Sequence, residues 1–140
     1  MHKGIIKTAS LIGALSVALG AFGAHGLKKF LDPQALNVFE TAVRYQFYHV
    51  FALLAVGLLY KDFASAALLN AARFFIMGIL LFCGSLYVLT FLAVQQTENF
   101  KWVGAITPLG GIAFILGWVL IFYSLLTKAK KINPAFRKLL

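Results

Sequence analysis

Six polar side chains that could carry chemistry lie within or beside long apolar stretches of the sequence. They are His25, Glu40, Arg44, Gln46, His49 and Thr107. Ionisable groups at membrane depth are costly and often mark functional sites. His25 ends one apolar stretch and His49 lies near the start of the next. We therefore expect the two imidazoles at similar depth, facing each other, in a polar cluster near the outer leaflet.

Three uses of this cluster are open. The side chains can satisfy one another and hold helices together, as buried polar groups in membrane bundles commonly do. They can line a path for a small solute or a proton. As a third option, His25 and His49 can be axial ligands of a haem or part of a quinone pocket.

Other chemistry is less well supported by the residue pattern. A zinc site needs about four ligands, and only His25, Glu40 and His49 would cluster, so we expect no metal site. No serine stands in a Gly-x-Ser-x-Gly context and no phosphate-binding glycine loop is present. We therefore assign no catalytic residue, name no cofactor beyond the haem option, and favour a non-enzymatic role.

The composition predicts what must surround these residues. Hydrophobic residues make up 61% of the 140-residue chain and charged residues 12%, with a mean hydropathy of +0.88. Soluble domains are about half apolar and a quarter charged, so this excess of apolar surface requires lipid. The net charge of +9 comes from Lys and Arg at the ends of apolar stretches, which is typical of membrane flanks and not of nucleic-acid binding.

Four stretches lack formal charge, namely 8–24, 45–60, 74–94 and 102–127. A helix rises 1.5 Å per residue, so 74–94 covers roughly 30 Å, the thickness of the hydrocarbon core. Helices satisfy their own backbone in lipid, whereas a barrel would need strands of alternating polarity. We predict one all-α domain over residues 1–140, a four-helix transmembrane bundle.

The second helix is expected to begin before its apolar stretch. Asp32 and Pro33 form a helix start, with Asp as N-cap and Pro at the first helical position. Residues 33–44 would then be an amphipathic extension at or just outside the external interface. Glu40 and Arg44 stand four residues apart in the favourable order for a helical ion pair.

Glycines in the first and fourth stretches recur at helical spacings that predict close helix packing. They are Gly13, Gly20, Gly23, Gly110, Gly111 and Gly117. The first stretch also resembles a secretory signal peptide, with Lys3 and Lys7 ahead of it and Ala21-Phe22-Gly23 near its end. A cleaved peptide needs no packing glycines, so we favour retention. The same glycines suit contacts within one chain or in a homo-oligomer.

Basic residues predict the orientation. One side of the membrane would carry Lys3, Lys7, Lys61, Arg73, Lys128, Lys130, Lys131, Arg137 and Lys138, and the other Lys28, Lys29, Arg44 and Lys101. The positive-inside rule then places both termini in the cytoplasm. The basic tail from Lys128 onward is also a candidate contact for anionic lipid headgroups.

Four short motifs fall in order along the chain: GAFGAHG at 20–26, YQFYH at 45–49, GSLY at 84–87, and ITPLGG at 106–111 followed by GW at 117–118. Together they resemble the small bacterial membrane proteins of domain-of-unknown-function family 423, which are related to eukaryotic transmembrane protein 256-like proteins. The resemblance implies four membrane spans and supplies no activity, cofactor or catalytic residue. It places His25, Gln46, His49, Thr107 and Pro108 within the family motifs.

We therefore predict a multi-pass protein of a bacterial cytoplasmic membrane with a structural or partner-binding role. Its partners would be the lipid bilayer and either a second copy or another membrane protein. The solute or proton pathway and the redox role stay as alternatives.

The predicted orientation can be tested with a cysteine engineered at the C-terminus. An impermeant thiol reagent applied to intact cells should leave this cysteine unlabelled, because the basic tail is expected inside. Labelling without permeabilisation would show that the tail lies outside.

Overall fold

The computed structural model describes residues 1–95 and 101–132, and that part of the chain is built of helices and contains no strand. The elements are α1 (Lys3–His25), η1 (Leu27–Lys29), α2 (Pro33–Leu59), α3 (Ala66–Gly78), η2 (Ile79–Cys83), α4 (Gly84–Val94), η3 (Lys101–Ala105) and α5 (Ile106–Ile132). The expected all-α, four-helix membrane bundle is confirmed.

Four helical rods are long and apolar enough to cross a bilayer within the described residues. They run over Lys3–Lys29, Pro33–Leu59, Ala66–Val94 and Trp102–Thr127. The third rod joins α3 to α4 through η2, a π-helical turn. Its 29 residues would measure roughly 43 Å as a regular helix, more than the hydrocarbon core requires.

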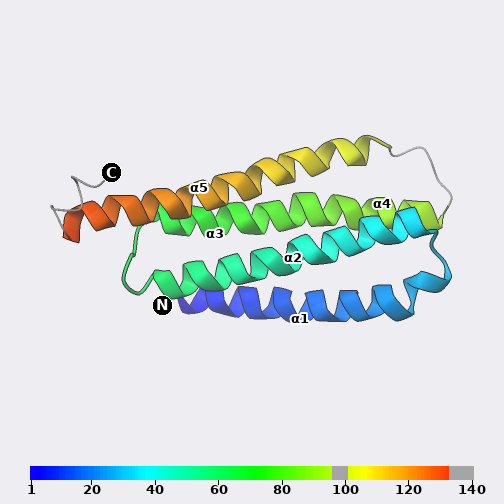
Figure 1. Cartoon of the computed structure of the whole chain (residues 1–140), viewed down its shortest axis with the longest axis horizontal. Coiled ribbons are helices and arrows are strands. Elements are labelled where there is room, and N and C mark those ends of the chain that lie inside the picture. Colours follow the sequence, from blue (N-terminus) through cyan, green and yellow to red (C-terminus); the bar gives the residue numbers. More distant parts are fainter. Residues whose placement is uncertain (96–100, 133–140) are drawn as a thin grey trace.

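The rods lie side by side, with α1 at one edge, then α2, then the α3–α4 rod, and α5 at the other edge (Figure 1). α1 begins and α5 ends at the same end of the bundle. The closest pairings are α1 with α2 and α3 with α5, and α2 joins the pairs through its contacts with α3, η2 and α4. α1 therefore packs almost entirely against α2.

Helix α2 starts where the sequence predicts. The Asp32 carboxylate accepts hydrogen bonds from the backbone N–H of Gln34 at 2.8 Å and of Ala35 at 3.0 Å, and Pro33 occupies the first turn. These bonds satisfy two of the backbone donors that a helix N-terminus leaves free. α2 is thus one uninterrupted helix to Leu59.

Contacts at three levels fix the register of α1 against α2. Gly57 faces Ile6 near one end, Gly13 faces Val50 in the middle, and Gly23 faces Phe39 near the other end. The backbone N–H of His2 also donates to the carbonyl of Gly57 at 2.8 Å. Because of this register, the amphipathic residues 33–44 lie beside the last turns of α1, at the same depth in the bundle.

The α5 helix approaches the π-helical turn backbone to backbone. A Cβ atom at Gly110 would overlap the main chain of Phe82. Further along the same helix pair, Gly78 of α3 receives the Phe114 ring and then Gly117 of α5 receives the Phe75 ring. Lipid gives no hydrophobic drive for helices to associate, so such close packing is what holds the pair together.

Replacing Gly110 by Ala should destabilise the bundle by about 1–3 kcal/mol, because the Phe82 backbone cannot move aside as a flexible side chain can. Unfolding of the purified protein in mixed detergent micelles, followed by circular dichroism, measures the change. Gly84→Ala is the matched control, since nothing lies within 4 Å of a Cβ placed there. Equal stability of the two variants would contradict the packing role of Gly110.

Candidate functional site

A polar network joins three helices at the middle of the bundle. The Gln46 side-chain amide donates to Ser16 Oγ at 2.9 Å and to the Ile12 carbonyl at 3.4 Å. Tyr87 donates its hydroxyl proton to Gln46 Oε1 at 2.9 Å. Ser16 in turn donates to the Ile12 carbonyl at 2.8 Å. α1, α2 and α4 are therefore tied by side-chain bonds at one level.

This network lies midway along α2. Gln46 is equally far from both ends of α2 and is 3% exposed. An unmade hydrogen bond is costly at this depth because no water can replace it. In the described residues, every fully buried side-chain nitrogen and oxygen has a partner. The network therefore holds α1, α2 and α4 together through hydrogen bonds.

His49 lies one turn from Gln46 on a neighbouring face of α2, among aromatic rings. Its ring stacks on Phe114 of α5 with 3.5 Å between centroids and 7° between planes. Phe75 of α3 lies at 5.5 Å and Trp118 of α5 at 6.4 Å from the imidazole centroid. The Nδ1 atom hydrogen-bonds the Tyr45 carbonyl at 2.7 Å. His49 therefore connects α2 to α5 and α3, in place of the expected link to α1.

The structure does not bring His25 and His49 together. His25 is exposed at the end of α1, and the α1–α2 register places it beside the first turns of α2. His49 lies about 11 residues further along α2, or roughly 16 Å. The expected meeting placed residues 33–44 at or just outside the interface, whereas these residues pack beside the last turns of α1. Two histidines this far apart cannot ligate one haem iron.

Glu40 and Arg44 are both exposed, and the contacts of the described residues include no ion pair between them. They line a shallow cleft of about 220 Å³ over the α1–α2 contact, together with Gly20 and Gly23. The described residues also contain no group of three or more His, Cys, Asp or Glu side chains that could hold a metal ion. Glu40 and Arg44 thus stay apart from the central network.

Thr107 belongs to a separate contact. Its hydroxyl hydrogen-bonds Ser85 Oγ at 2.7 Å, and Ser85 also donates to the Phe82 carbonyl at 2.9 Å. A π-helical turn leaves carbonyl groups without their usual helical donors, so side-chain hydroxyls can take that place. Thr107 therefore helps α5 to hold the π-helical turn.

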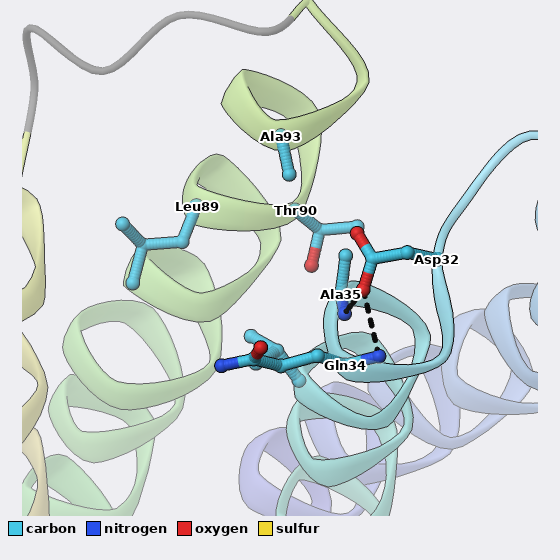
Figure 2. Close-up of a pocket in the computed structure, with 7 residues that line it drawn as sticks. Asp32, Gln34, Ala35, Leu89, Thr90 and Ala93 are labelled. Atoms are coloured by element: carbon cyan, nitrogen blue, oxygen red, sulfur yellow. Dashed lines mark hydrogen bonds between the residues drawn. The ribbon is translucent and has the colours of Figure 1, made fainter.

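Two cavities open on the sides of the bundle. One, of about 240 Å³, lies between the start of α2 and the end of α4, where Asp32 and Gln34 face Thr90 and Ala93 (Figure 2). The other, of about 250 Å³, is an apolar groove between α1 and the third rod. Its lining is Ile12, Leu15, Gln46, Ile76, Ile79, Leu80, Gly84 and Tyr87.

Three residues that contact Gln46 or His49 were not predicted from the sequence, namely Ser16, Tyr87 and Phe114. A register count would have found the first. Antiparallel neighbours joined by a short connection pair at equal distances from it, which sets Ser16 opposite Gln46. The stack of Phe114 on His49 could not be found in this way. It joins α2 to α5, and no short connection fixes the register of these two helices.

The fold and the central site define a small integral membrane protein with four helical spans. Residues 19–111 match the family described as "Protein of unknown function (DUF423)". The chain belongs to this family, and the resemblance noted in the sequence is confirmed. No solved structure matches the chain.

Bacterial relatives match over most of their length. The UPF0382 membrane protein YwdK of Bacillus subtilis is 40% identical over 121 residues, which are 83% of this chain and 94% of that protein. A UPF0382 membrane protein of Haemophilus influenzae is 41% identical over 123 residues, covering 88% and 94%. These names support a multi-pass bacterial membrane protein. The relation to eukaryotic proteins stays a prediction.

A double-mutant cycle on Gln46→Leu and Tyr87→Phe should show coupling of about 0.6–1.7 kcal/mol, the range known for hydrogen bonds between membrane helices. The unfolding free energy in mixed micelles is the quantity to compare. Tyr123→Phe, at an exposed tyrosine of α5, is the control and should leave stability unchanged. Strict additivity of the two central substitutions would show that their bond contributes nothing.

Proposed function

We propose that this protein is a non-enzymatic structural component of the membrane that assembles with a second copy of itself through α1. The observation that carries the proposal is the poor coverage of α1. In an 18-residue apolar stretch of this span, only 17% of the residues are buried inside the protein. The corresponding share is 44% for α2 and 33% for each of the other two spans. An edge helix with one neighbour has room for another.

The face of α1 that points away from α2 carries a row of small residues, bordered by the exposed Leu11 and Val17. The residues that face α2 include Ile5, Ala9, Ser16 and Gly23. The opposite face presents Ser10, Ala14, Ala18 and Ala21, all exposed and spaced three or four apart. Small residues at this spacing let two membrane helices approach closely enough for van der Waals contact. A second α1 helix is the simplest partner of matching shape.

The central network supports a structural role over a transport path. The side chains of the network hydrogen-bond one another, namely Gln46, Ser16 and Tyr87. The groove beside them is lined mainly by apolar side chains. A solute or proton path needs polar groups with free bonding capacity along the membrane normal. Glu40 and Arg44 do not extend the network toward either surface.

We also propose that the end carrying the start of α1 faces the cytoplasm. Lys3, Lys7, Lys61 and Arg73 are exposed and belong to the elements that meet at this end of the bundle. Lys28 and Lys29 lie at the other end. This asymmetry fits the positive-inside rule. The anionic-lipid contact expected at the basic tail falls on side chains outside the described residues and stays a prediction.

Cysteine cross-linking tests the α1 interface. In a Cys83→Ala background, Ala18→Cys, at a residue on the outward face of α1, should give a disulfide-linked dimer when the membranes are oxidised. Ala14→Cys and Ala21→Cys should behave alike, because all three positions share one helical face.

Ile115→Cys is the control, at an exposed position of α5, the helix at the other edge of the bundle. It should remain monomeric under the same conditions. If Ala18→Cys stays monomeric, or if Ile115→Cys dimerises as readily, self-assembly through α1 is refuted.

A further inference from the structure

The imidazole of His49 has one nitrogen that the described part of the chain does not engage. Nδ1 faces the Tyr45 carbonyl at 2.7 Å, and a carbonyl can only accept, so Nδ1 carries the proton. A charged imidazolium at the bilayer centre would be costly, so the ring is neutral. Nε2 is then a bare lone pair, an acceptor without a donor among the described groups.

This nitrogen is not sealed inside the protein. His49 as a whole is 5% exposed. Yet no fully buried side-chain nitrogen without a partner occurs in the described residues, so Nε2 must keep some accessible surface. The small exposed part of the ring therefore includes its acceptor atom. An acceptor left bare in hydrocarbon is costly, and an approaching donor would recover that cost.

Two partly exposed aromatic side chains lie near the imidazole. Tyr45 lies one turn before His49 on α2, and Trp118 lies one turn beyond Phe114 on α5. The two are 40% and 50% exposed, so they present ring surface to lipid beside the imidazole. Phe114 holds the imidazole plane from behind through the parallel stack. The stack thus fixes the orientation of the imidazole, and one amphipathic ring of α2 and one of α5 lie near it.

We infer that His49 Nε2 accepts a hydrogen bond from the hydroxyl group of a membrane-soluble molecule whose head docks between Tyr45 and Trp118. The donor must be neutral and apolar enough to reach the bilayer midplane. Two kinds of molecule share this chemistry, a reduced quinol with its aromatic hydroxyl and a long-chain alcohol such as a polyprenol. This site is independent of the proposed assembly through α1.

The surroundings of His49 do not favour a metal ion as the occupant. No second histidine lies near it, and Tyr45, Phe75, Phe114 and Trp118 bring no group that ligates metals strongly. The described residues contain no cluster of three metal-binding side chains. A hydroxyl donor needs only the single acceptor that the ring offers.

Nitrogen NMR of the full-length protein in lipid vesicles tests the inference without any substitution. The chain contains 3 histidines, so ¹⁵N-histidine labelling gives few signals, and loss of one in His49→Phe assigns it. Duroquinol should shift the His49 Nε2 resonance, whereas duroquinone, which has the same ring and no hydroxyl, should not. Farnesol is the aliphatic arm. The signals of His2 and His25 are internal controls and should stay in place.

Each outcome decides the inference. A shift with duroquinol alone supports an aromatic hydroxyl as the donor, a shift with farnesol alone supports an aliphatic one, and a shift with both supports the shared chemistry. No shift with either compound refutes the inference. An equal shift with duroquinone shows that no hydroxyl donor is involved, and a protonated Nε2 removes the acceptor itself.

A binding measurement completes the test. Partitioning of the active compound into protein-containing vesicles should weaken about threefold to tenfold in His49→Phe, the effect of one neutral hydrogen bond. His25→Phe, at an exposed residue near the end of the bundle, should bind as the original chain does. Unchanged binding by His49→Phe would overturn the inference even if the NMR signal moves.

Discussion

The contact of α5 with the π-helical turn of the third rod sets the geometry of the rest of the molecule. At Gly110 the backbone of α5 meets the backbone of Phe82, with no side chain between them. This closeness lets Thr107 reach Ser85 and lets Phe114 pass over Gly78 to stack on His49. In lipid, where apolar surface gains nothing by leaving its solvent, such contact area is the main attraction between helices.

The absence of water from the membrane interior explains how polar groups are placed. Along α2, Gln46 turns toward α1 and α4, and His49 turns toward α3 and α5. The amide of Gln46 finds two acceptors on α1 and a donor on α4, and its network is closed. His49 finds one acceptor for its proton and only aromatic rings for its other nitrogen. Of these two polar residues one turn apart, Gln46 therefore has both its polar side-chain atoms hydrogen-bonded, whereas His49 keeps one nitrogen without a donor among the described residues.

The sequence predicts the features that depend on local patterns. Charge-free stretches give the number of spans, and Asp32 with Pro33 gives the start of α2, because capping depends on adjacent residues. The depth of His49 is predicted wrongly because the expected span starts only after the last charged residue, Arg44. The helix in fact includes Glu40 and Arg44 and packs against α1 along that part as well. Neither the π-helical turn nor the Phe114 stack has a local signature, since both arise from the packing of helices distant in sequence.

The order of the rods connects the two proposals. α2 is the inner helix that packs against α1, α3 and α4 and meets α5 through the His49–Phe114 stack, and it carries both central polar residues. Its Gln46 side binds the edge helix α1, which we propose as the assembly surface, and its His49 side meets α5, which covers the other edge. Because Gln46 and His49 point to different neighbours of one helix, the assembly surface and the acceptor site are separate and can be tested independently.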